Sequence, residues 1–251
     1  MVFDPTEAAR RFLTPNRRSD SRGISEERIW IDGPSGRIAI TQAGAGPIVM
    51  LVHGWDGEAA DLKHFVPGFL RAGYRLIAPD LPGHGFSDGA LASIPACADA
   101  LLAVQRHFGE LHAVVAHSIG CPMTVLAASK GMDVRNLALI AAPARYVDYV
   151  EVFAKQVGLT SQESDMMIAA LRNRGVDVES ISLPAIARGL HQRTLFIHST
   201  DDRVVPFADG LETASAWQGA RMFQVDGLGH RRILRDPVVL EKVIGFIGTQ
   251  K

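Results

Sequence analysis

The 251-residue chain has little cysteine, little tyrosine or tryptophan, almost no net charge and no long apolar run. Its two cysteines, Cys97 and Cys121, are too few for a disulfide framework and lack the spacing of a zinc site. Both lie in segments with helical patterning, which indicates buried free thiols in a reducing compartment. We therefore expect a cytoplasmic protein without a structural metal.

The charge balance and the hydropathy argue against two further kinds of partner. The 26 Lys and Arg residues nearly balance the 27 Asp and Glu residues, and the formal net charge is -1. This balance leaves no basic surface for nucleic acid. No apolar run approaches the ~20 residues that a membrane-spanning helix needs, and the first residues lack the apolar core of a secretory signal. We expect neither nucleic-acid binding nor membrane insertion, while homo-oligomerisation stays open.

The chain has an ordinary globular composition, 47% hydrophobic and 21% charged, which predicts one domain over residues 1–251. Residues 1–23 combine a short amphipathic stretch with a polar segment, and we expect them to form a loosely docked N-terminal arm. Two short runs at 27–31 and 37–41, separated by turn residues, predict a hairpin. From residue 47 onward, apolar strands alternate with helices. This alternation predicts a mainly parallel sheet with helices on both faces.

Ser118 lies at the most informative point of this alternation, between an apolar strand at 112–116 and a helix that begins near Ile119. A serine on so tight a turn projects from the carboxyl edge of the sheet, beside the positive end of the helix. Both features suit a nucleophile. The same position also suits a serine that only caps the helix, so the rest of the chain must supply partners for a catalytic role.

Residues 116–120, Ala-His-Ser-Ile-Gly, resemble the nucleophile elbow G-x-S-x-G of the α/β-hydrolase superfamily, with Ala116 in place of the first glycine. Four other loops resemble segments of the same family, and each follows an expected strand. They are H-G-W at 53–55, D-L-P-G-H-G-F-S at 80–87, H-S-T-D-D-R-V-V-P at 198–206 and G-L-G-H at 227–230.

The resemblance implies an α/β fold with a mostly parallel central sheet of about eight strands, flanked by helices and carrying a short helical lid. It implies a catalytic triad of Ser118, Asp202 and His230, in the chain order Ser…Asp…His of the family. It also implies that the backbone N–H groups of Trp55 and Ile119 form the oxyanion hole. No cofactor and no metal are implied.

Several other side chains compete for roles in these loops. Asp201 is the rival of Asp202 as the partner of the catalytic histidine. Four residues are expected to support the loops by hydrogen bonds rather than to carry protons: His53, His84, Ser87 and His117. Residues 146–191 interrupt the strand–helix alternation where the family inserts its cap, and they form either a substrate-covering lid or two ordinary crossover helices. The side chains expected to line the substrate pocket are Trp55, His117, Tyr146, Met166 and Met167.

The activity that the resemblance implies is hydrolysis of carboxylic esters with small to medium acyl groups, through an acyl-enzyme. A thioesterase, a C–C bond hydrolase or a cofactor-free perhydrolase would use the same triad. A ligand-binding member of the superfamily is the non-enzyme alternative, against which an intact triad argues. Epoxide and halide chemistry is disfavoured because those relatives carry Asp at the elbow. The expected partner is therefore a small-molecule ester.

Overall fold

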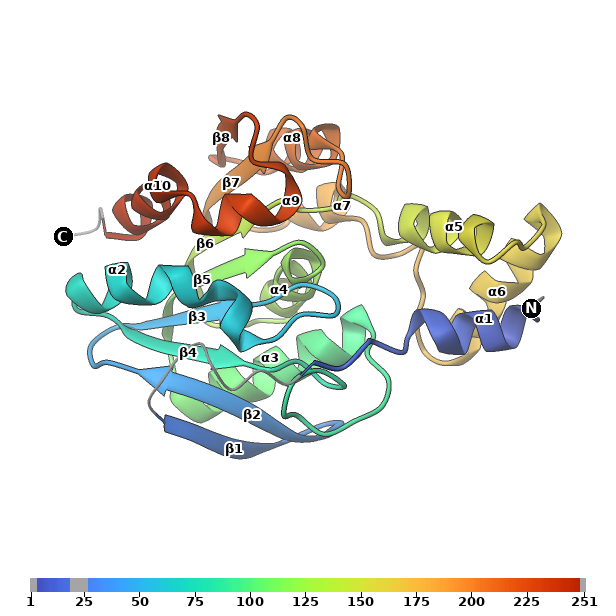
Figure 1. The fold of residues 1–251 in the computed structure, drawn as a ribbon, viewed down its shortest axis with the longest axis horizontal. Coiled ribbons are helices and arrows are strands. Elements are labelled where there is room, and N and C mark those ends of the chain that lie inside the picture. The colour runs from blue at the N-terminus through green and yellow to red at the C-terminus, as the bar shows by residue number, and fades with distance from the viewer. Residues whose placement is uncertain (1–3, 19–26, 249–251) are drawn as a thin grey trace.

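An eight-stranded sheet runs through the middle of the protein in a computed structural model that describes residues 4–18 and 27–248 (Figure 1). Its strand order is β1-β2-β4-β3-β5-β6-β7-β8. The first two strands form the expected hairpin, and β2 also pairs antiparallel with β4, whereas all later neighbours are parallel. The strands are β1 (Glu27–Gly33), β2 (Gly36–Ala43), β3 (Ile48–Val52), β4 (Arg75–Pro79), β5 (Leu111–His117), β6 (Val134–Ile140), β7 (Arg193–Ser199) and β8 (Arg221–Val225).

Helices cover both faces of the sheet, which confirms the predicted fold class. One face packs against α3 and α4, and the other against η1, α2 and α10. The helices are α1 (Pro5–Phe12), η1 (Ala59–Phe65), α2 (Val66–Arg71), α3 (Ile94–Phe108), α4 (Gly120–Ser129), α5 (Tyr146–Gln156), α6 (Ser161–Asn173), α7 (Leu183–Ala187), α8 (Phe207–Ala216), α9 (Gly229–Arg232), η2 (Ile233–Arg235) and α10 (Pro237–Gly248).

The central strand β5 shows why its sequence is almost continuously apolar. Val114 and Ala116 point into the core beneath α3 and α4, whereas Ala113 and Val115 point into the core beneath α2 and α10. All four side chains are fully buried. Because helices cover both sides of such a strand, no alternation of polar and apolar residues remains. The parallel arrangement brings the carboxyl ends of β3, β5, β6, β7 and β8 to one edge of the sheet.

Residues 146–191 form α5, α6 and α7, and the N-terminal helix α1 packs against α5 and α6 (Figure 1). Ala8 and Ala9 of α1 are fully buried, so α1 is packed more closely than the loosely docked arm that we expected. Residues 1–3 and 19–23 of this arm lie outside the described residues. Together, α1, α5 and α6 project from the body of the protein as a helical unit (Figure 1).

In the part of the chain that the structure describes, no helix is both long enough and apolar enough to cross a bilayer.

Candidate active site

Ser118 occupies a strained turn between β5 and α4. Its φ angle is +54°, in the left-handed region that residues with a Cβ seldom adopt. Its N–H donates to the Ile140 carbonyl oxygen (2.9 Å), and its own carbonyl oxygen accepts from the Cys121 N–H (2.9 Å). Gly120 is required because a Cβ there would lie only 2.5 Å from the carbonyl oxygen of His53. This packing holds the Ser118 hydroxyl at the carboxyl edge of the sheet.

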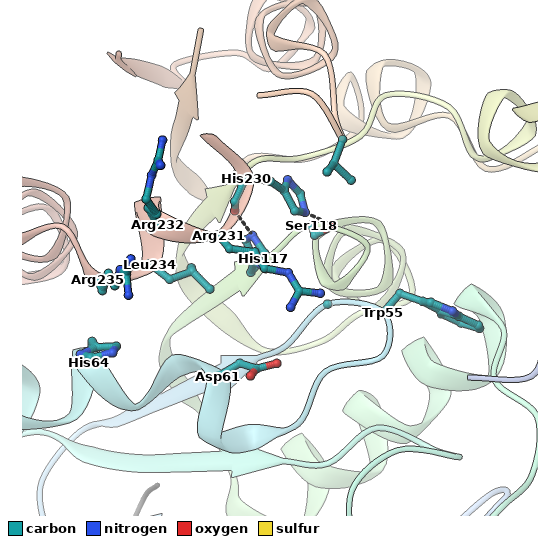
Figure 2. Close-up of a pocket in the computed structure, with 12 residues that line it drawn as sticks. Trp55, Asp61, His64, His117, Ser118, His230, Arg231, Arg232, Leu234 and Arg235 are labelled. Atoms are coloured by element: carbon teal, nitrogen blue, oxygen red, sulfur yellow. Dashed lines mark hydrogen bonds between the residues drawn. The ribbon is translucent and has the colours of Figure 1, made fainter. Parts of the chain in front are cut away.

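His230 and Asp202 reach this edge from two neighbouring loops. His230 Nε2 lies 3.0 Å from Ser118 Oγ, and His230 Nδ1 lies 2.8 Å from Asp202 Oδ2. Asp202 follows β7, whereas His230 belongs to the short helix α9 after β8. Figure 2 shows His230 beside Ser118. The three residues named from the sequence therefore form one hydrogen-bonded chain.

The surroundings of Asp202 favour its ionised form. Its Oδ1 accepts the N–H groups of Val204 (2.8 Å) and Val205 (3.0 Å). Burial raises the pKa of this carboxyl, but the imidazoles of His198 and His230 and the two N–H groups lower it more, so the pKa lies well below its ordinary value. Asp202 is thus negatively charged near neutral pH and favours the His230 tautomer that carries its proton on Nδ1.

His198 is a second imidazole at Asp202, and sequence analysis missed this contact. It is 1% exposed, and its Nε2 lies 3.0 Å from the Val205 carbonyl oxygen and 3.6 Å from Asp202 Oδ2. In the sequence His198 marked only the start of a loop motif, because the turn that brings Val205 back to it is not visible there.

Among residues 4–18 and 27–248, no three His, Cys, Asp or Glu side chains are placed to hold a metal ion.

Asp201 does not contact His230 and instead braces the loop that carries it. Its Oδ1 accepts the Ser199 hydroxyl (2.5 Å) and the Gly229 N–H (2.9 Å). These bonds connect the end of β7 with the start of α9. Of the two adjacent acids, Asp202 contacts the His230 imidazole, whereas Asp201 stabilises the loop.

The Trp55 and Ile119 N–H groups lie on the two segments that meet at Ser118. Gly54 allows this close approach, since a Cβ there would lie 3.1 Å from Ser118 Cβ. Ile119 directly follows Ser118 and precedes the first turn of α4. Within the described residues, neither N–H donates to another protein group. Both donors are thus available to an oxygen atom that lies next to Ser118.

The remaining polar residues of the loops make structural hydrogen bonds. His53 Nδ1 donates to the Gly54 carbonyl oxygen (2.7 Å), and its Nε2 accepts the Leu81 N–H (3.0 Å). His117 Nε2 donates to the His230 carbonyl oxygen (2.9 Å) and so fixes the backbone of α9. The Ser87 hydroxyl is fully buried and donates to the Asp80 carbonyl oxygen (2.6 Å).

We expect the protein to lose stability in mild acid, because three buried histidines have lowered pKa values. Burial lowers the pKa of His53 and His84 to about 4 and that of His117 to about 3. In the unfolded chain each takes up a proton near pH ~6.5. Between about pH 6.5 and 4 the unfolded state therefore binds more protons than the folded state, and stability falls as the pH falls. We expect the free energy of unfolding in urea to drop by at least about 3 kcal/mol over this range. A flat profile would contradict the prediction.

Two cavities meet at Ser118 and Trp55. The larger, about 590 Å³, lies beneath α5 and has mainly apolar and aromatic walls. The smaller, about 380 Å³, lies on the His230 side of Ser118, next to α9 and η2 (Figure 2). The larger cavity is lined by Phe12, Pro143, Tyr146, Tyr149, Val152 and Phe153, among others. The residues that line the smaller cavity include Asp61, His64, His117, Arg231, Leu234 and Arg235.

Of the residues expected in the substrate pocket, Trp55, His117 and Tyr146 each line a cavity at Ser118. Met166 and Met167 line neither cavity. Met167 is fully buried in the core, whereas Met166 is 54% exposed. This corrects the expectation that these two methionines line the pocket. The reason is that α6 packs against α1 rather than over Ser118.

The N-terminal segment holds the loop that carries Trp55, a role that sequence analysis did not indicate. The backbone N–H and the side-chain amide of Asn16 donate to the two carboxylate oxygens of Asp56 (2.7 and 3.0 Å). Arg18 Nε donates to the Asp56 carbonyl oxygen (2.7 Å). Asp56 directly follows Trp55 and has a φ angle of +54°. These bonds help to stabilise a strained residue next to a candidate oxyanion donor.

Comparisons with known proteins identify the same fold. A family model described as "alpha/beta hydrolase fold" matches residues 47–160. A pimeloyl-[acyl-carrier protein] methyl ester esterase of Xanthomonas campestris is 27% identical over an alignment of 234 positions, which covers 76% of this chain and 90% of that protein. The magnesium-chelatase 30 kDa subunit of Rhodobacter capsulatus is 35% identical over 79 residues, but these span only 30% of this chain and 28% of that protein.

Among solved structures, an esterase from Exiguobacterium antarcticum superposes with a TM-score of 0.73 at 17% identity, covering 89% of this chain and 100% of that one. At this identity the likeness shows the fold alone. The resemblance inferred from the five loop segments is confirmed at the level of the fold, while the roles of individual residues rest on the contacts described above.

Proposed function

The chain has the alpha/beta hydrolase fold, and on this basis we propose that it is a serine hydrolase that cleaves carboxylic esters through an acyl-enzyme. The observation that carries the proposal is the hydrogen-bonded chain from Ser118 Oγ through His230 to Asp202, with distances of 3.0 and 2.8 Å. A serine that merely capped α4 would need neither partner. The two buried free thiols support a cytoplasmic location.

In the first half of the reaction, Ser118 Oγ attacks the carbonyl carbon of the ester while His230 Nε2 takes the hydroxyl proton. The negative charge of Asp202 stabilises the imidazolium that forms. The bond from the carbonyl carbon to the alcohol oxygen then breaks, and His230 returns the proton to the leaving alcohol. The acyl group stays on Oγ as an ester.

In the second half, a water molecule gives a proton to His230 and attacks the acyl carbon. The bond to Ser118 Oγ breaks, Oγ regains the proton, and the free acid leaves. Both tetrahedral intermediates carry their charge on the former carbonyl oxygen. The Trp55 and Ile119 N–H groups are the donors that we assign to this oxygen, a contact worth about 10²- to 10³-fold in rate per donor in comparable sites.

The larger cavity suits the acyl chain. Its volume of about 590 Å³ and its apolar walls favour small to medium acyl groups. Part of its wall comes from α5, within residues 146–191, which supports the interpretation of this segment as a substrate-covering cap. Another part comes from α1, so the cap as we propose it includes the N-terminal helix.

Phe12 provides the test of this extended cap. Its ring lies 5.5 Å from the ring centroid of Tyr146 and 5.3 Å from that of Phe153, and it lines the larger cavity. We expect Phe12→Ala to raise KM for octanoyl esters about tenfold, because apolar contact with the chain is lost, and to change KM for acetyl esters little. Phe108→Ala is the matched control, since Phe108 is a partly buried aromatic that lines neither cavity. Equal effects on both chain lengths would contradict the prediction.

The enzyme class is tested by labelling and by a substrate panel. A fluorophosphonate should modify the protein at Ser118, and 4-nitrophenyl esters from acetyl to octanoyl should be hydrolysed. The same panel contains an acyl-CoA thioester and a vinylogous diketone, which a thioesterase and a C–C bond hydrolase would prefer. A protein that takes no label and turns over none of these substrates would be a ligand-binding member of the fold.

A further inference from the structure

The smaller cavity is lined by three arginines, Arg231, Arg232 and Arg235, whereas Arg11 and Arg203 line the larger one. It opens on the other side of Ser118, and its wall is formed partly by the continuous helical stretch of α9 and η2. Arg231 and Arg235 both line it from this stretch. Figure 2 shows Arg231 next to His117, and Arg235 near His64 on the facing segment. Two cations therefore border a cavity that ends at the candidate nucleophile.

Within the described residues, no carboxylate is paired with either of these two arginines. Neither forms an ion pair with an acidic side chain of residues 4–18 and 27–248. Asp61, the acid that lines the cavity in the described part of the chain, is itself paired with Arg18 at 2.8 Å. Arg232 also lines the cavity, but its guanidinium donates to the carbonyl oxygens of Gly227 (2.8 Å) and Leu228 (3.2 Å).

The placement of Arg231 and Arg235 is unfavourable for the protein alone. They are four residues apart on a helical stretch, and like charges at this spacing repel each other. The charge of Arg231 also acts on the buried His117 imidazole, where it adds to burial and to His230 in lowering the His117 pKa. Arg231 is itself exposed to solvent and lines the cavity next to His117 (Figure 2).

We propose that Arg231 and Arg235 bind an anionic group, a carboxylate or a phosphate, carried by the substrate on the side of the scissile bond opposite its apolar chain. This inference rests on the proposed ester hydrolysis and narrows its substrate class. A guanidinium binds the planar carboxylate or the phosphate oxygens through two parallel N–H bonds. The substrate is then an ester with one apolar arm in the larger cavity and one anionic arm in the smaller.

Matched pairs of substrates test the inference. The first pair, 4-(butanoyloxy)benzoate and 4-(butanoyloxy)benzamide, carries the charge on the alcohol side, and 4-(butanoyloxy)phenyl phosphate adds the phosphate. The second pair, monomethyl adipate and methyl adipamate, carries it on the acyl side and so tests the arrangement in which the acyl arm enters the smaller cavity. Each kcat/KM is divided by the rate constant of hydroxide-catalysed hydrolysis, which removes intrinsic reactivity. We expect the anionic member to be favoured about tenfold in at least one pair, and less so in about 0.5 M NaCl because salt screens the contact.

Variants test whether the two arginines cause the preference for anionic substrates. Arg231→Gln combined with Arg235→Gln should bring the anionic-to-neutral ratio close to one and should weaken competitive inhibition by benzoate or phenyl phosphate. Arg106→Gln, an exposed arginine on α3 far from the cavity, should leave the ratio unchanged.

The outcomes separate failure of the anion site from failure of the proposed function. A ratio at or below one in both pairs, with the neutral esters still hydrolysed and Ser118 still labelled, overturns the anion site alone. If no ester is hydrolysed and Ser118 takes no label, the proposed function fails, and the anion site fails with it. A preference that persists in the double variant also overturns the assignment to Arg231 and Arg235.

Discussion

Ser118→Ala is expected to lower kcat/KM on 4-nitrophenyl butanoate by about 10⁴- to 10⁶-fold and to abolish fluorophosphonate labelling. The loss is large because no other group can form the acyl-enzyme, whereas the substrate cavities remain intact. Ser118 has a φ angle of +54°, and alanine meets the same backbone strain there. We therefore expect Tm to change by less than about 3 °C.

The control for this prediction is peptide mapping of the labelled protein. Ser87 belongs to another family-like loop, but it is fully buried and bonded to the Asp80 carbonyl oxygen. Label should appear on Ser118 in the parent protein and nowhere in the variant. Label on Ser87 in the variant, or turnover within about tenfold of the parent, would mean that Ser118 is not the nucleophile.

Asp202→Asn is expected to lower kcat by about 10⁴-fold. An asparagine amide that faces His230 can donate to Nδ1, which moves the imidazole proton to Nε2. His230 Nε2 then cannot accept the proton of Ser118. The Val204 and Val205 N–H groups still need an acceptor, and the amide oxygen supplies it, so the fold should survive.

The adjacent acid is the matched control, because Asp201→Asn makes the same chemical change one residue away. The Asp201 carboxylate accepts the Ser199 hydroxyl and the Gly229 N–H, and an asparagine oxygen can accept both. We expect kcat to fall less than about tenfold. Single-turnover kinetics of both variants at neutral pH give the comparison. The reverse ranking would assign the orienting role to Asp201.

Sequence analysis captured the sheet because burial on both faces leaves a direct trace. The run at 47–52 is nearly all apolar, and it corresponds to β3, Ile48–Val52, between two helical layers. The chemistry-bearing loops were also recognisable, because a turn as tight as that at Ser118 tolerates few residues. Gly120 shows this constraint directly, since its neighbour in space is the His53 carbonyl oxygen.

The cap could not be predicted in the same way. The amphipathic pattern of α1 shows that the helix has a partner, but it does not identify α6 as that partner. The adjacency of Met166 and Met167 shows that they face different ways. Which one is buried depends on where α1 packs, and α1 is distant in the sequence. The contact of His198 with Asp202 likewise depends on a turn whose geometry has no sequence pattern of its own.

The packing of α1 against α6 also sets an order of assembly during synthesis. Helix α1 is complete at Phe12, but α6 ends only at Asn173, so at ordinary rates of translation α1 waits on the order of ten seconds for its partner. An eight-residue helix is marginal in water without packing. Helix α1, made before every other helix of the described residues, is therefore among the last of them to reach its final place.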